Sequence, residues 1–395
     1  MQLLTFLTRK QAWLSPSEIG RSFRLDGEPI TSRTIHRWFA FLRANGGFVY
    51  YPYPRANYLG LQDVLVRIHG LRNPDALGVL PFGASFTAEV GLADGHPFVS
   101  QAYWVPGNAL RAFEEYWEAA RDLDLVGKVE MFRTRNTHFF FSPFHEMITA
   151  DGKAEMHGKV ENSYFEAWFR RHQREKFEVR LGDRIAASPL IIPSVVEHIW
   201  GHYSSRHVWD AISSKGEEAI LAYGKRFFTR ALERPGSALR LLQMQWKELL
   251  DHFDEVFLQP RVAFDWPRLR NSMQLTVMMH TNSAESMVQA VTKASERSII
   301  TAVKPGLGPE GWCHLSCFMP SDQQSAVLHV VNEYHRDRDP PLLAIQDRET
   351  TISMFRRAFC KVDWRLFDPS TLSWRFEGDA YLERLKELKS VGTSA

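Results

Sequence analysis

The chain has 395 residues, of which 44% are hydrophobic, 24% charged and 13% aromatic. This composition is typical of a globular protein and excludes a disordered or collagen-like chain. At roughly 150 residues per domain, the length predicts two to four domains. The sequence contains no uncharged apolar run long enough for a membrane span, and its first residues lack a signal-peptide pattern. Three cysteines give no disulfide framework, so we predict a cytoplasmic protein without membrane contact.

The net charge of +2 is unevenly distributed along the chain. Residues 1–61 contain eight basic and three acidic side chains, whereas the rest of the chain carries a net charge of −3. A basic segment on a mildly acidic body favours a polyanion as the partner of that segment alone.

The basic segment has the pattern of a helix-turn-helix. Residues 2–10 predict a short helix, and the capping box Ser15-Pro16-Ser17-Glu18 begins a second one. Asp26-Gly27-Glu28-Pro29 opposes helix continuation and predicts a turn. Thr31 then caps a longer helix, which ends at the stop signal Asn45-Gly46-Gly47.

The third predicted helix has one apolar face, with Arg33 and Arg37 on the opposite side. This is the arrangement of a helix that enters the major groove of DNA. Residues 48–51 and 56–59 predict two strands of a wing around the basic turn that contains Arg55. The candidate DNA-binding residues are Ser15, Thr31, Ser32, Arg33, His36, Arg37 and Arg55.

The body contains two copies of the order β-α-β-β-α-β, which is the ferredoxin-like split unit. The first copy lies at 64–135 and the second at 272–347. Ile68-His69 aligns with Met279-His280, and Tyr103-Trp104-Val105-Pro106 aligns with Cys317-Phe318-Met319-Pro320. In both copies a strand ends in proline and an amphipathic helix follows. We therefore predict an internal duplication.

The segment before the second module resembles the helix and wing of the head. Residues 241–250 predict a helix, and residues 256–261 resemble a wing strand, but Asp251, Asp254 and Glu255 would repel phosphate. We interpret it as a degenerate winged helix. The predicted α+β chain then divides into a winged helix-turn-helix at 1–61, a ferredoxin-like module with an extension at 62–192, a degenerate winged-helix region at 193–270, and a second module with a C-terminal extension at 271–395.

This order of parts resembles Lrp/AsnC-type prokaryotic, especially archaeal, transcriptional regulators. Residues 15–47 and the two β-α-β-β-α-β units carry the resemblance. The chain is more than twice as long as the simple family members, and the linker after its wing is very short. The resemblance implies a sequence-specific regulator of double-stranded DNA whose modules pair edge to edge and bind a small-molecule effector. Because operators usually need two reading heads, we expect a homodimer.

Two other functions stay open as alternatives. The head is also compatible with a ligand-sensing or scaffold protein whose winged helices bind protein. The second alternative is a small-molecule enzyme that uses the ferredoxin-like modules, although no acid–base pair or Ser/His/Asp order stands out. We therefore expect no enzyme and no cofactor.

Several histidines and cysteines are candidate metal or effector ligands. His198 and His202 are four residues apart, but two ligands are too few for a metal, so we expect no metal site. Cys313 and Cys317 are interpreted as buried small hydrophobic residues. His69 and His280 occupy matching strand positions, where core histidines are commoner than effector contacts.

Overall fold

The structure is a computed structural model. It describes residues 2–9, 14, 16–46, 49–54, 56, 60–134, 138–139, 155, 257–263, 271–280, 289, 292–294, 298–305, 312–346, 362–363, 366–368 and 373–392. Among these residues, no helix is both long enough and apolar enough to cross a membrane.

The head is a helix-turn-helix, as predicted. Its elements are α1 (Gln2–Arg9), α2 (Pro16–Ser22), β1 (Arg24–Leu25), β2 (Glu28–Pro29) and α3 (Ser32–Gly46). The Thr31 hydroxyl accepts a hydrogen bond from the Thr34 backbone N–H at 3.2 Å, which is the predicted cap of α3. Asp26 and Gly27 both have positive φ and form the tight turn between β1 and β2.

Gly20 lets α2 approach the start of α3. A Cβ atom at this position would lie 2.5 Å from the Ile30 carbonyl oxygen and 3.3 Å from the Ser32 nitrogen. We expect Gly20→Ala to lower the protection of α3 amides in hydrogen exchange, because overpacking against backbone costs about 1–3 kcal/mol. Gly107→Ala is the control, because a Cβ there meets nothing within 4 Å. Equal protection in the two variants would contradict the close approach.

The first ferredoxin-like module follows the predicted order. Its elements are β4 (Leu61–His69), α4 (Ala76–Val79), β5 (Gly83–Gly91), β6 (Pro97–Pro106), α5 (Leu110–Asp122) and β7 (Val129–Arg133). The second module contributes β10 (Ser272–His280), β11 (Ile299–Pro305), β12 (Trp312–Pro320), α13 (Gln324–Tyr334) and β13 (Leu342–Gln346). Most of its first predicted helix lies outside the described residues.

The strand registers confirm the internal duplication. In the first module Leu61 pairs with Pro106 and His69 with Phe98, while in the second Ser272 pairs with Pro320 and His280 with Trp312. Each module also has a register shift at the same place, between Gly83 and Ser85 and between Ile300 and Ala302. Every position of β4 therefore has a defined equivalent in β10, and positions 98–106 of β6 have defined equivalents in β12.

The two modules form one nine-stranded sheet, in the order β7-β4-β6-β5-β13-β10-β12-β11-β8, where β8 is His138–Phe139. The link is the antiparallel pairing of β5 with β13, in which Val90 faces Ile345. The edge-to-edge pairing that the family resemblance implies between subunits thus occurs within this chain. Homodimer formation stays a prediction.

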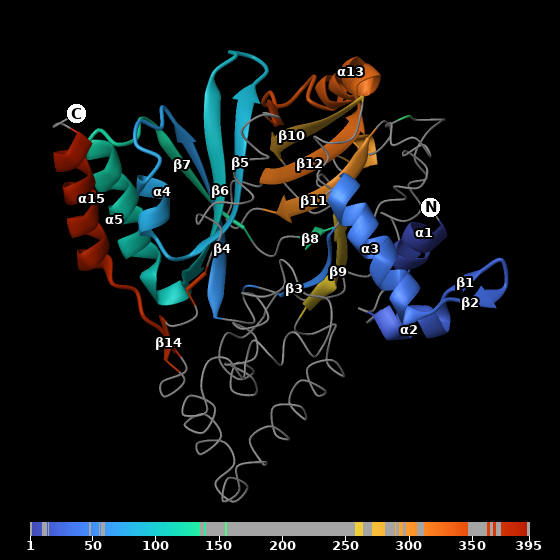
Figure 1. Ribbon diagram of the computed structural model, residues 1–395. Helices are drawn as coiled ribbons and strands as arrows, with labels where there is room; N and C mark the ends of the chain where they lie inside the picture. The colour runs from blue at the N-terminus through green and yellow to red at the C-terminus, as the bar shows by residue number, and fades with distance from the viewer. Residues whose placement is uncertain are drawn as a thin grey trace, which may run out of the picture.

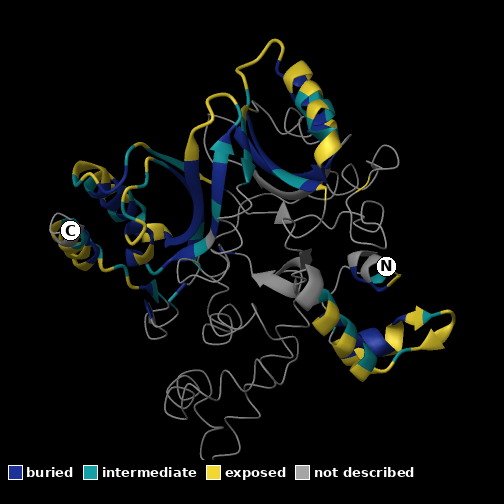
Figure 2. Cartoon of the chain, turned by 45° about the horizontal axis from the view of Figure 1, so that its top comes forward, coloured by how far each residue is buried: buried dark blue, intermediate teal, exposed yellow. Residues whose placement is uncertain are grey.

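In the described part of the chain, α4, α5, α13 and α15 lie on the same face of this sheet (Figure 1). In the first module α4, α5 and the C-terminal helix α15 (Gly378–Gly392) pack on side chains such as Val64, Val66 and Tyr103. In the second, Val327 and Val331 of α13 pack on Leu275, Val277 and Met279. The strands are largely buried, whereas α2 and α3 of the head are largely exposed (Figure 2).

The first predicted wing strand has a partner that the sequence did not indicate. The strand β3 (Val49–Pro54) pairs antiparallel with β9 (Phe257–Ala263). Ala56 belongs to a 3₁₀ turn, and residues 57–59 lie outside the described part. The expected pairing of residues 48–51 with residues 56–59 stays a prediction, because most of its second strand lies outside the described residues. Most of the predicted region 193–270, including the helix at 241–250, also lies outside the described residues.

Candidate functional site

We call one face of the sheet the inner face. It is the face opposite to the one on which α4, α5 and α13 pack. Phe132 on β7 and Trp312 on β12 both lie on it, with five strands between them. In a flat sheet these strands would be about 29 Å apart. Their rings are nevertheless in edge contact, with centroids 5.1 Å apart, and both pack with Leu65 and Met278. The sheet therefore curls until its two halves meet across the inner face.

Arg67 lies at this contact between the halves. Its side chain is only 3% exposed, and its guanidinium lies 4.9 Å from the Phe98 ring centroid and 5.5 Å from that of Phe132. Nη2 donates to the Met278 sulfur at 3.7 Å, and Nε has no hydrogen-bond partner within the described part of the chain. Burial lowers the pKa of Arg67, and the charges of Glu89 and Glu130 oppose that shift. The result is a buried cation with incomplete hydrogen bonding.

Glu130 connects Arg67 to the surface. One carboxylate oxygen accepts a 2.6 Å bond from Lys128 Nζ, and the other lies 3.5 Å from Arg67 Nη1 and 3.3 Å from His69 Nε2. Arg67, His69, Lys128 and Glu130 are called the charged cluster. The side chains of Glu130 and His69 are 27% and 29% exposed, so this cluster reaches solvent at the end opposite Arg67. Partial burial opposes ionisation of Glu130, but the Lys128 hydrogen bond and the charge of Arg67 outweigh it, and the pKa of Glu130 lies below its ordinary value.

This lowered pKa predicts an acid-sensitive contribution to stability. A carboxyl whose pKa is depressed by folding stabilises the protein above its unfolded pKa and loses that effect as the pH falls through the folded value. Glu130→Gln is therefore expected to cost about 1 kcal/mol near neutral pH, and this difference from wild type should shrink below about pH 4. Urea unfolding at several pH values measures it. A difference that stays constant or grows in acid would contradict the assignment.

Glu89 joins the two modules from within. Its carboxylate accepts hydrogen bonds from the Ser100 hydroxyl at 2.7 Å and from the Thr276 hydroxyl at 2.6 Å. Ser100 belongs to the first module and Thr276 to the second, and all three residues are buried. The inner face thus carries two carboxylates near Arg67, one deeply buried and one at the rim.

The charged cluster belongs to the first module alone. Arg67 pairs with Glu130 across β4 and β7, and at the equivalent positions of the second module Met278 pairs with Leu342. Phe98 and Ser100 correspond to Trp312 and His314. Since a methionine–leucine pair occupies the same place in the same fold, the fold itself does not require the charges.

The structure separates this cluster from the residues predicted to bind DNA. Thr31, Ser32, Arg33, His36 and Arg37 are exposed on or beside α3, as expected for its basic face. Ser15 and Arg55 lie outside the described residues. The candidate metal ligands His198 and His202 lie outside them too. No part of the predicted DNA-binding set reaches the inner face among the residues that are described.

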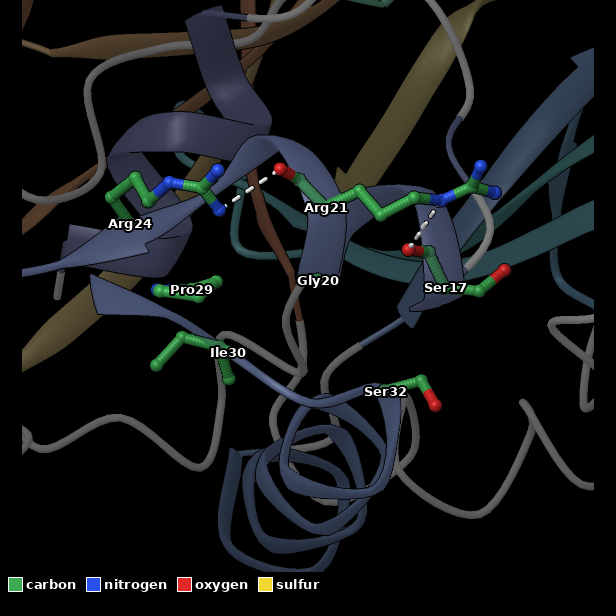
Figure 3. A pocket seen from close by; sticks show the side chains of 7 residues that line it. All are labelled: Ser17, Gly20, Arg21, Arg24, Pro29, Ile30 and Ser32. Atoms are coloured by element: carbon green, nitrogen blue, oxygen red, sulfur yellow. Dashed lines mark hydrogen bonds between the residues drawn. The ribbon is translucent and has the colours of Figure 1, made fainter. Parts of the chain in front are cut away.

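Ser32 also lines a hollow of about 490 Å³ in the head, between α2, β2 and the start of α3 (Figure 3). Arg21 and Arg24 lie on its wall and donate to backbone carbonyls of Ser17 and Arg21, at 3.4 and 3.0 Å. Both arginines are exposed at the surface. Both guanidinium groups bond to backbone carbonyls of the head itself, and the described residues that line the hollow include no catalytic set.

His69 was a candidate site residue from the sequence, whereas Arg67, Glu89 and Glu130 were not predicted. The sequence Val64-Leu65-Val66-Arg67-Ile68 contains one signal for Arg67. Apolar residues occupy both faces of this strand, because Val64, Val66 and Ile68 lie on one face and Leu65 lies on the same face as Arg67. Such a strand is buried on both faces, so its arginine must be buried too. Cys313 and Cys317 are fully buried as predicted, and burial raises the pKa of both thiols. No group of three or more metal-ligand side chains occurs among the described residues.

Comparisons with known proteins give a likeness in fold. No family model matches the chain, and no curated protein matches it. Two solved structures align with 99% of this chain and 98% of their own, at 11% and 10% identity and TM-scores of 0.47 and 0.45. They are a siroheme decarboxylase, NirDL, and the same enzyme in complex with an iron-uroporphyrin III analogue.

These comparisons correct the predicted function. The expectation of a DNA-binding transcriptional regulator that is not an enzyme was wrong, because both aligned structures belong to an enzyme. The physical reason is that the pattern of a basic helix-turn-helix predicts a solvated, positively charged surface. It does not determine which molecule binds to that surface. The comparisons do not test the roles given to individual residues of the head. At this identity the likeness concerns the fold and transfers no residue or reaction.

Proposed function

We propose that the chain is an enzyme that acts on a compound with several carboxylates, and that Arg67 on the inner face binds one of them. The observation that carries the proposal is the incomplete bonding of this buried guanidinium. Within the described part of the chain, the carboxylate oxygen of its ion-pair partner Glu130 is 3.5 Å away, and Nε lacks an acceptor. Burying a charge is costly unless it is paired and hydrogen-bonded.

The surroundings of Arg67 fit a flat, carboxylate-bearing molecule. Phe98 and Phe132 provide aromatic surface beside the guanidinium, and Met278 adds a polarisable apolar contact. Arginine presents its donors in a planar fork that matches the two oxygens of a carboxylate. His69 lies at the partly exposed end of the cluster, where its imidazole can form a hydrogen bond with a bound compound.

Siroheme is the first compound to test, because it carries several carboxylates and the aligned enzyme is named for it. The protein is incubated with siroheme under anaerobic conditions, and the products are followed by mass spectrometry. We expect a product lighter by CO₂, formed by wild type and not by a variant that lacks Arg67. Absence of conversion together with absence of binding to siroheme or iron-uroporphyrin III would contradict the proposal.

A further inference from the structure

We propose that Glu130 is a displaceable counter-ion, which neutralises Arg67 in the free protein and yields its place to a substrate carboxylate. This inference rests on the proposed function and assigns a role to the one carboxylate of the cluster that lies at its solvent-facing end. It makes Glu130 a residue that sets substrate affinity without contacting the reacting atoms.

Glu130 forms a shorter bond with Lys128 than with Arg67, as a displaceable counter-ion of Arg67 requires. The bond to Lys128 is 2.6 Å long and lies on the exposed side, whereas the contact with Arg67 is 3.5 Å and lies on the buried side. Charge-assisted N–H···O bonds are normally about 2.7–2.9 Å long. The carboxylate is therefore held mainly by the surface lysine and only loosely by the buried arginine.

Arg67 has bonding capacity that Glu130 does not use. Only Nη1 reaches Glu130, Nη2 donates to a weak sulfur acceptor in Met278, and Nε has no partner among the described residues. A carboxylate that binds two nitrogens of the guanidinium at normal distances would make a stronger contact than the single long one. Exchange of Glu130 for such a group is therefore favourable at Arg67.

The exchange leaves no charge unpaired. Glu130 would keep Lys128 and His69 as partners, and Arg67 would be paired by the incoming carboxylate. Glu89, the other carboxylate near Arg67, cannot move in the same way, because the buried hydroxyls of Ser100 and Thr276 hold it on both oxygens. The geometry therefore selects Glu130 as the exchangeable group.

The test compares binding of iron-uroporphyrin III to full-length variants by absorbance titration. Glu130→Gln removes the competing carboxylate and is expected to tighten binding about 3- to 10-fold. The matched control is Glu114→Gln, which removes the same charge from a 2.6 Å ion pair with Arg133 outside the cluster. Tighter binding in E130Q than in E114Q supports the proposal. Unchanged or weaker binding in E130Q would overturn it.

A second variant keeps the test decisive if E130Q folds poorly. Lys128 is mostly exposed, so Lys128→Gln is expected to fold normally. Without Lys128, Glu130 should turn toward Arg67 and weaken binding of the probe, and this weakening should vanish in the double variant K128Q/E130Q. Equal weakening with and without Glu130 would mean that Lys128 attracts the ligand directly, and it would overturn the proposal.

Arg67→Gln separates this inference from the proposed function. If R67Q binds iron-uroporphyrin III as wild type does, the proposed carboxylate site itself is wrong. If R67Q loses binding but E130Q does not gain it, only the counter-ion role of Glu130 fails.

Discussion

The double substitution Arg67→Met with Glu130→Leu is expected to abolish function while preserving the fold. It installs in the first module the pair that the second module carries at the equivalent positions, Met278 and Leu342. Replacing a buried ion pair by apolar residues of similar size is often neutral for stability. Because Glu89 still loses its cation, we expect the double variant to be less stable than wild type but more stable than R67M alone, and the affinity for iron-uroporphyrin III to fall about 10- to 100-fold.

The single substitution and a surface pair provide the controls for this variant. Arg67→Met alone leaves the buried Glu89 and the rim residue Glu130 without their shared cation, and it should cost about 3 kcal/mol. Replacing the exposed pair of Arg133 and Glu114 by methionine and leucine should change neither quantity much. A double variant that is as unstable as R67M, or that binds the probe as wild type does, would contradict the functional reading of the cluster.

The largest loss of stability is expected from Glu89→Ala. This change leaves the buried hydroxyls of Ser100 and Thr276 without their acceptor and removes a charge near Arg67. Breaking a buried charged network by removing one member costs about 3–5 kcal/mol. Urea unfolding measures this loss of stability. Because Glu89 bonds to both modules, we expect both modules to be destabilised together.

Two variants show whether the charge or the hydrogen bonds matter at this position. Glu89→Gln keeps one side-chain acceptor and should lose about half as much as E89A. Glu115→Ala removes an exposed carboxylate paired with Arg111 on α5 and should cost less than about 0.5 kcal/mol. A loss in E89A no larger than that in E115A would show that Glu89 does not join the modules.

The sequence was informative about elements and about the duplication. Alternation of apolar residues in Val64–His69 and the matching Tyr103–Pro106 and Cys317–Pro320 segments predicted strands whose registers the structure confirms. Thr31 was identified as a cap from its position alone, and its hydroxyl accepts the expected bond. These features are local, because helix caps and strand alternation depend on residues a few positions apart.

The cluster could not be assembled in the same way, because its members are far apart in the chain. Arg67 and Glu130 meet only through the register of β4 with β7, and Arg67 and Met278 meet only because the sheet curls. Alternation shows which residues share a face of one strand, but it does not give the partner strand or the curvature. The same limit explains the wing, whose strand β3 pairs with β9 more than two hundred residues later.

The most direct test of the central claim is a crystal structure of the protein with iron-uroporphyrin III bound. We predict a ligand carboxylate within hydrogen-bonding distance of at least two nitrogens of Arg67, with Glu130 retained by Lys128. A ligand bound away from the inner face, with Arg67 still paired to Glu130, would contradict the assignment of this face as the substrate site.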